Sequence, residues 1–233
     1  MRTTVSITSQ RITKQSQTRD SVIDLMERLG VGSAIPSERQ LSVDLGVSRL
    51  TVRAALDELV REGKVGAVGA SNFTAEQLAE AVEISELEGL ARYEWVQNSY
   101  SLLDCGDDET LFPVCREHGL GYEAFGPLAG GWLTGRYRRG AGYPEGSRMT
   151  QRPDGYRKYE NDACFDALEA FEARAADHGV SMAGLAIAWL LGVPEMTAVV
   201  VGPTRAEQLE PIREALGVRL DAEDHADLRG LFA

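Results

Sequence analysis

The segment from Ser48 to Lys64 belongs to two different sequence patterns at once. Before it, short stretches carry apolar residues at the spacing of a helix. After it, strand-like and helix-like stretches alternate. One apolar-striped helix over this segment therefore ends the first pattern and begins the second. We expect two parts joined inside that helix, with a flexible arm over residues 1–14, a first domain over residues 15–64 and a second domain over residues 65–233.

The charge of the chain is divided in the same way. Through Lys64 there are ten Lys and Arg against eight Asp and Glu, and after it fourteen against twenty-eight, so the net charges of +2 and −14 sum to −12. A mildly basic first part on an acidic second part is typical of a protein whose first part alone meets a polyanion. No apolar run reaches the length of a membrane span, about 18 residues. Three cysteines fit no metal spacing and suit a reducing compartment, so we predict a cytoplasmic protein without a metal site.

The first part predicts three helices. Val22, Leu25, Met26 and Leu29 form one apolar stripe, and the stretch that begins at Pro36 starts a second helix capped by Ser37. A glycine turn then leads to a third helix, which Ser48 caps. A short helix, a glycine turn and a serine-capped helix are typical of a helix-turn-helix, whose last helix enters the major groove of DNA.

Two stretches, Ile35–Leu41 and Leu45–Leu56, resemble the GntR family of winged-helix repressors. The resemblance runs from about Thr18 to Val65, and the family's basic wing is replaced by the stretch from Gly66 to Ala70. It implies a regulator of transcription that binds double-stranded DNA. Arginine can bind guanine with two hydrogen bonds, and hydroxyl groups suit phosphate. The DNA contacts implied are Arg39, Ser48, Arg49, Thr51 and Arg53.

The second part alternates strands and helices, which is typical of βα units in a parallel sheet. We expect strands near residues 66–70, 94–98, 121–125 and 197–201, each followed by helical sequence. A closed (β/α)8 barrel needs twice as many units. The predicted fold class is therefore α/β, with an N-terminal helix-turn-helix that lacks its wing, followed by half of a TIM barrel.

From about Ala55 to the C-terminus the chain resembles the aldo-keto reductase family. The matching stretches are Gly69–Phe73, Val96–Asn98, Phe125–Tyr137 and Val201–Leu209. They follow the family's order and correspond to the ends of its strands five to eight.

The resemblance implies a site for NADP(H) at the strand ends. It places Ser71, Asn72 and Gln97 at the nicotinamide carboxamide and the ring of Phe125 against the nicotinamide. Backbone from Leu128 through Gly130 to Gly131 would approach the pyrophosphate, and the phosphate of the adenosine would meet Gly202, Thr204, Arg205 and Gln208. Arg205 favours NADP over NAD. From the residues alone, Ser71 and Asn72 also suit a helix cap, and the loop glycines suit simple turns.

Two departures from the family weaken this expectation. Pro211 and Ile212 stand where the family reads the adenine, so we expect NADP binding to be weak or vestigial. The family's catalytic Asp, Tyr, Lys and His precede the matched segment, and the first 65 residues contain no Tyr and no His. Tyr156, Lys158 and Tyr159 fall in a long polar loop and are interpreted as surface residues. We assign no catalytic residue.

Three functions remain open at this point. We favour a GntR-like DNA-binding regulator whose barrel-derived part binds NADP(H) weakly and self-associates, as a homodimer or a larger assembly, through its unpaired edge strands. The alternatives are an NADP-dependent aldo-keto reductase and an inactive product of recombination. The operator sequence and the carbonyl substrate cannot be read from the sequence.

Overall fold

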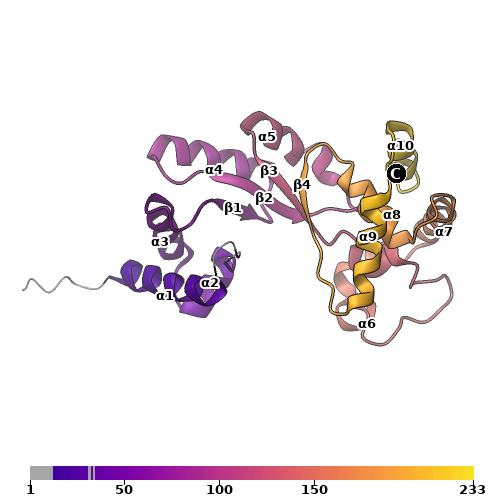
Figure 1. The fold of residues 1–233 in the computed structure, drawn as a ribbon, viewed down its shortest axis with the longest axis horizontal. Helices are drawn as coiled ribbons and strands as arrows, with labels where there is room; N and C mark the ends of the chain where they lie inside the picture. The colour runs from indigo at the N-terminus through magenta and orange to yellow at the C-terminus, as the bar shows by residue number, and fades with distance from the viewer. Residues whose placement is uncertain (1–12, 31–32, 34) are drawn as a thin grey trace, which may run out of the picture. The chain divides into compact units, whose positions relative to one another are not determined.

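The computed structural model describes residues 13–30, 33 and 35–233, and its ribbon is shown in Figure 1. Of the predicted arm, residues 1–12 lie outside the described residues, and the rest is not an arm, because Thr13 caps a helix that begins at Lys14. The chain divides into two compact units. The first contains the described residues up to Val68 together with Glu83–Tyr93, and the second contains Gly69–Val82 and Glu94–Ala233.

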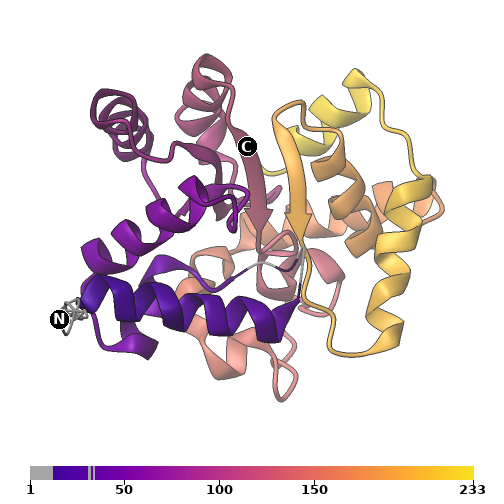
Figure 2. The same ribbon diagram turned by 60° about the vertical axis from the view of Figure 1, so that its left-hand side comes forward.

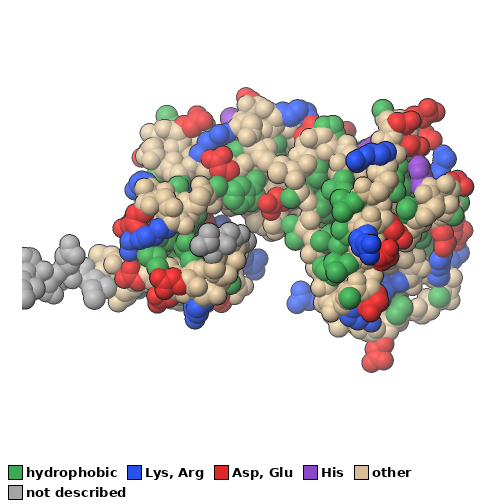
Figure 3. All heavy atoms as spheres, viewed as in Figure 1, with side chains coloured by type: hydrophobic (Ala, Val, Ile, Leu, Met, Phe, Trp, Pro, Cys, Tyr) green, Lys and Arg blue, Asp and Glu red, His purple; other side chains and the backbone are tan. Residues whose placement is uncertain are grey.

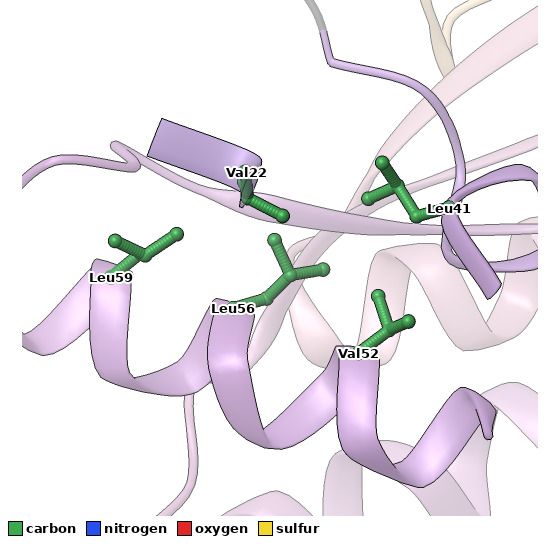
Figure 4. Close-up of a cluster of buried hydrophobic side chains, with 5 residues drawn as sticks. All are labelled: Val22, Leu41, Val52, Leu56 and Leu59. Carbon is green, nitrogen blue, oxygen red and sulfur yellow. The ribbon is translucent and has the colours of Figure 1, made fainter. Parts of the chain in front are cut away.

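Three helices make up most of the first unit: α1 (Lys14–Leu29), α2 (Glu38–Leu45) and α3 (Arg49–Arg61). Each begins where a hydroxyl side chain accepts a hydrogen bond from a backbone N–H two or three residues inside the helix. Their inner faces bury one apolar cluster, shown in Figure 4, which consists of Val22, Leu41, Val52, Leu56 and Leu59. Burial of these side chains is what holds the short helices together, because isolated helices of this length are marginal in water.

A four-stranded sheet lies in the second unit except for Val68 and Tyr93, the first residues of two strands. Its strands are β1 (Val68–Ser71), β2 (Tyr93–Ser99), β3 (Gly121–Phe125) and β4 (Met196–Val200), in the order β1-β2-β3-β4. β3 runs parallel to both β2 and β4, and the last two strands lie side by side in Figure 2. The observed strands match the predicted ones within two residues. This arrangement is an α/β fold with a parallel sheet, consistent with part of a TIM barrel.

Helices follow the strands as βα units require. The connections contain α4 (Ala75–Glu88) after β1, α5 (Leu111–His118) after β2, and the short α6 (Arg148–Gln151), α7 (Asp162–Asp177) and α8 (Met182–Leu191) after β3. After β4 come α9 (Glu210–Gly217) and α10 (Ala222–Gly230), of which α10 was not expected from the sequence. α5 packs against β3 and α8 against β4.

The two faces of the sheet differ in chemistry. Val96, Tyr122 and Ala124 are completely buried on one face. The other face carries a row of half-buried or exposed side chains, and the register pairs Gln97 with Glu123 and Ser99 with Phe125. Because side chains alternate along a strand, these pairs share one face. We call this second face the polar face, because Gln97, Ser99 and Glu123 lie on it beside the ring of Phe125.

Two glycines on this polar face leave room for side chains of the neighbouring strands. A Cβ atom at Gly69 would lie 2.3 Å from Nε1 of Trp95, and one at Gly121 would lie 3.0 Å from Oγ1 of Thr197. The indole of Trp95 therefore occupies the space that a larger residue at position 69 would need.

From the last residue of β4 onward, apolar side chains reach the surface. Val200 and Val201 are exposed, as are Leu209 and Leu216. The space-filling view shows hydrophobic side chains gathered over the segment after β4 and beside α9 (Figure 3). Within the described residues β4 is an edge strand, which accounts for this exposure.

Replacing Gly69 by Ala tests the packing of β1 on β2. Gly69→Ala should lower the free energy of unfolding by about 1–3 kcal/mol, because the new methyl group must displace the ring of Trp95. Gly66→Ala is the matched control, since its Cβ would meet nothing within 4 Å. Urea denaturation of both variants gives the comparison, and equal stabilities would show that Trp95 does not need the space at position 69.

Candidate cofactor-binding site

All predicted cofactor contacts lie in or after the carboxyl ends of the strands. Parallel strands bring these ends to the same edge of a sheet, which is where ligands bind in such folds. Two non-glycine residues in the described part of the chain have positive φ angles, Asn72 at 56° and Ala129 at 47°. They lie in the loops after β1 and β3. Non-glycine residues with positive φ angles are concentrated at functional sites. The loops after β1 and β3 are therefore candidates for ligand binding.

Ser71 and Asn72 do not cap the helix that follows them. Thr74 and Gln77 do so instead, each accepting a hydrogen bond from the other's backbone N–H, at 3.3 and 3.0 Å. The side chains of Ser71 and Asn72 are exposed and bonded to each other, Nδ2 of Asn72 donating to Oγ of Ser71 at 2.9 Å. The alternative interpretation of these two residues as a helix cap is therefore wrong.

Two hydrogen bonds tie the loop after β1 to β2. The backbone N–H of Asn72 donates to the carbonyl of Gln97 at 3.1 Å, and Nδ2 of Asn98 donates to the carbonyl of Phe73 at 3.0 Å. The resemblance placed Ser71, Asn72 and Gln97 at one ligand group. The hydrogen bonds therefore hold the two segments that carry these residues together. Phe125, at the end of β3, is half-buried and in register with Ser99 on the same face as Gln97.

The loop after β3 leaves two backbone donors without an acceptor. The N–H of Ala129 bonds to Gly126 and that of Gly131 bonds to Leu128, but in the described residues no acceptor meets the N–H of Leu128 or Gly130. Successive N–H groups in a loop with left-handed residues form a concave site for anions. The expectation that this loop approaches a pyrophosphate is compatible with that geometry.

Gly130 has a further role that the sequence did not indicate. Its φ is +66°, and a Cβ atom there would lie 2.4 Å from the ring of Tyr156. Tyr156 therefore packs directly on the loop backbone. Tyr159, also predicted to be a surface residue, is buried, with its ring centroid 6.0 Å from that of Trp132.

The loop after β4 gathers donors around one oxygen atom. Oε1 of Gln208 accepts hydrogen bonds from the backbone N–H groups of Thr204 and Arg205, at 2.7 and 3.2 Å, and lies 3.2 Å from the hydroxyl of Thr204. Three donors converging on one acceptor suit a phosphate oxygen equally well. Gly202 and the side chain of Arg205 are exposed beside this turn.

The residues at the strand ends can be matched to the groups of a nicotinamide dinucleotide. Free N–H groups after β3 and convergent donors after β4 provide two places for anionic groups, and a half-buried ring on β3 and an amide side chain on β2 lie on the same sheet. The donor set therefore fits the cofactor. The departure at Ile212 has a structural explanation, since Ile212 packs against Ile187 and Ala215 in a small core.

Two buried tyrosines of this unit are poorly suited to donate a proton to a substrate. Tyr100 and Tyr122 donate hydrogen bonds to Asp108 and Asp107, and burial followed by these hydrogen bonds raises the pKa of both phenols. A phenol with a raised pKa that already donates to a carboxylate releases its proton reluctantly.

The described residues contain no cluster of three or more His, Cys, Asp or Glu side chains that could hold a metal ion. Cys105, Cys115 and Cys164 are free thiols. Among the helices of the described chain, none has the length and apolar character to cross a membrane.

Comparison with known proteins identifies the family. The model of the Aldo/keto reductase family matches residues 36–232. This chain belongs to the aldo/keto reductase family. It is 33% identical to the uncharacterized oxidoreductase YrpG of Bacillus subtilis, over 76% of this chain and 52% of the relative. It is 30% identical to the NADH-specific methylglyoxal reductase of Escherichia coli, over 76% of this chain and 51% of the relative.

A third relative is the L-glyceraldehyde 3-phosphate reductase of Escherichia coli O157:H7, 36% identical over 70% of this chain and 48% of its own length. The chain thus spans about half the length of the curated relatives it matches.

The predicted GntR-like DNA-binding regulator is wrong. The aldo/keto reductase match begins at residue 36, so α2 and α3 lie inside it, and the comparisons give no support for a winged-helix domain, a DNA partner or a role in transcription. The interpretation kept as the alternative, an oxidoreductase of the aldo-keto reductase family, fits better.

The contacts inside the first unit give a physical reason for this correction. Arg53 pairs with Glu38 at 3.0 Å, donates to the carbonyl of Ala91 at 3.2 Å and covers the ring of Tyr93 at 4.1 Å, so its guanidinium is already occupied. Ser48 accepts from the N–H of Thr51, and the two hydroxyls are bonded at 2.8 Å. Three of the five predicted DNA contacts therefore have structural roles, while Arg39 and Arg49 are simply exposed.

The packing of Tyr156 on Gly130 can be tested with a matched glycine. Gly130→Ala and Gly140→Ala both place a methyl group on a backbone with φ near +70°, but only the first meets a neighbour, since nothing lies within 4 Å of a Cβ at Gly140. We expect Gly130→Ala to be less stable than Gly140→Ala by about 1–3 kcal/mol, because overpacking adds to the shared backbone strain.

The measurement is chemical denaturation of both variants. Tyr156→Ala in the Gly130→Ala background should recover part of the difference, because it removes the ring that the methyl group meets. No difference between the two glycine variants would mean that Tyr156 does not rest on Gly130.

Proposed function

We propose that this chain binds NADP(H) across the carboxyl ends of its four strands and supplies the cofactor-binding half of an aldo-keto reductase-type oxidoreductase. The observation that carries the proposal is the gathering of donors at these ends. Loops after β1, β3 and β4 each present groups with spare or convergent hydrogen-bonding capacity, and β2 contributes an amide between them. Membership of the aldo/keto reductase family makes a nicotinamide cofactor the expected ligand of these groups.

Each group has a separate task in this proposal. Ser71, Asn72 and Gln97 orient the nicotinamide through its carboxamide, and Phe125 provides an apolar surface for the ring. Leu128 to Gly131 hold the pyrophosphate through backbone N–H groups. The cofactor, when bound, supplies a hydride to a carbonyl carbon.

The adenosine phosphate is assigned to the loop after β4. Gly202 leaves the backbone open, and Thr204 and Arg205 direct N–H groups to a single point now held by Oε1 of Gln208. A phosphate oxygen would replace that amide oxygen. The exposed guanidinium of Arg205 favours a 2′-phosphate and hence NADP, although one relative is named as NADH-specific.

Reduction of a carbonyl also needs a proton donor. We infer that four of the described tyrosines do not supply it, because Tyr156 packs on Gly130, Tyr159 is buried, and Tyr100 and Tyr122 are bound to carboxylates. A cytoplasmic location stays a prediction.

Replacing Arg205 tests the preference for NADP. Arg205→Ala should weaken NADPH binding by about tenfold to a hundredfold and leave NADH binding nearly unchanged, because an arginine–phosphate hydrogen bond contributes about 1.5–3 kcal/mol. Arg213→Ala is the matched control, since Arg213 is exposed on α9 and pairs with Glu210. Fluorescence titration with both cofactors gives the constants. An equal loss for NADPH and NADH would remove Arg205 from the phosphate site.

Turnover tests the absence of a proton donor. Incubated with NADPH and a small aromatic aldehyde, the chain should bind the cofactor without oxidising it, because Tyr100, Tyr122, Tyr156 and Tyr159 are bound to carboxylates, packed on backbone or buried. Absorbance of NADPH over time is the measurement. Sustained oxidation that depends on the aldehyde and survives in Tyr156→Phe and Tyr159→Phe would show that another group donates the proton.

A further inference from the structure

The polar face of the sheet carries one carboxylate that the proposed function does not use. Glu123 lies in β3 in register with Gln97 of β2, and the two side chains are joined by a hydrogen bond of 2.9 Å from Nε2 of Gln97 to Oε2 of Glu123. Both side chains are half-buried. The pair therefore lies on the polar face, on the two strands β2 and β3 whose carboxyl ends belong to the proposed site.

An ionised carboxylate determines which way an amide points. A glutamine side chain has a donating nitrogen and an accepting oxygen of similar shape, and either end can face a neighbour that both donates and accepts. A carboxylate accepts only. With Glu123 beside it, the nitrogen of Gln97 must face the carboxylate, and its Oε1, at the other end of the planar amide, must point away from Glu123.

That oxygen is available as an acceptor. In the described part of the chain no hydrogen bond reaches Oε1 of Gln97, and it is not among the buried polar atoms that lack a partner. The backbone of Gln97 is itself held, because its carbonyl accepts from Asn72 in the loop after β1. The backbone carbonyl and the side-chain nitrogen of Gln97 are thus both held by hydrogen bonds. The side-chain oxygen Oε1 is left to accept a hydrogen bond from a ligand.

We propose that Glu123 is a positioning residue that fixes the amide of Gln97 as an acceptor for the NH2 group of the nicotinamide carboxamide. The inference rests on the proposed cofactor site. It adds that recognition of the carboxamide depends on a carboxylate that never touches the cofactor. Without Glu123 the amide of Gln97 rotates freely and presents either group.

The positioning role of Glu123 can be measured as the ratio of the affinities for two cofactors. The probe pair is NADP⁺ and its 3-acetylpyridine analogue, in which a methyl group replaces the carboxamide NH2. The wild type should bind NADP⁺ about five- to tenfold more tightly than the analogue, the worth of one hydrogen bond. Glu123→Leu should reduce this ratio to about one, and Glu123→Gln should give an intermediate ratio, because its amide can accept or donate.

A control variant separates positioning from charge. Glu94 is an exposed carboxylate at the start of β2, and no hydrogen bond joins it to Gln97. Glu94→Leu removes the same charge from the neighbouring strand and should keep the wild-type ratio. A ratio that falls equally in Glu94→Leu and Glu123→Leu would overturn the inference in favour of a general effect of charge.

A second measurement needs no cofactor. In the NMR spectrum of the 15N-labelled protein, the side-chain NH2 signals of Gln97 are those that disappear in Gln97→Ala. In the wild type they should exchange slowly with water, and in Glu123→Leu they should take the exchange rate of a solvated glutamine. The same variant must keep the backbone spectrum of the wild type, which shows that it has folded.

The outcomes are distinguishable. Failure of every variant to bind NADP⁺ or the analogue overturns the proposed function, and with it the carboxamide as the ligand. Side-chain signals of Gln97 that are unchanged in Glu123→Leu overturn the positioning by Glu123, whether or not the cofactor binds. Signals that are released while the binding ratio stays at its wild-type value overturn the link between that positioning and the carboxamide.

Discussion

Parallel pairing of the strands is the constraint on which the rest of the second unit depends. Because β3 is parallel to β2 and β4, the loops that follow them leave the sheet at one edge, and groups more than a hundred residues apart in the chain lie at that edge. Close pairing of β1 with β2 relies on Gly69, which leaves room for the ring of Trp95. The hydrogen bond from Asn72 to the carbonyl of Gln97 then extends this alignment into the loop.

Much of the local structure could be predicted from the sequence. Alternating segments located all four strands within two residues, and the serine caps of α2 and α3 were correct because a hydroxyl accepting a backbone N–H is a local signal. The same local signals misled the functional interpretation of the first unit. Caps and a glycine turn are needed by any short helices that pack together, so they do not distinguish a DNA-binding unit from the part of an aldo/keto reductase that the family match covers.

Contacts between distant residues could not be predicted. The pairing of Gln97 with Glu123 follows from the register of two strands, and the packing of Tyr156 on Gly130 follows from the path of a long loop. Likewise His225 of α10 stacks on Trp189 of α8, with ring centroids 4.8 Å apart, and this contact depends on how the two helices pack. The chemical type of a residue is known from the sequence, but the residue that it contacts depends on the fold.

The central claim is that one ligand contacts the ends of all four strands. Hydrogen–deuterium exchange with and without NADPH tests it most directly, because backbone amides held by a ligand exchange more slowly. We expect protection in the segments 71–73, 97–98, 126–131 and 202–208, with no change in α1, α2 or α3. No protection at saturating NADPH, or protection confined to the three N-terminal helices, would contradict it.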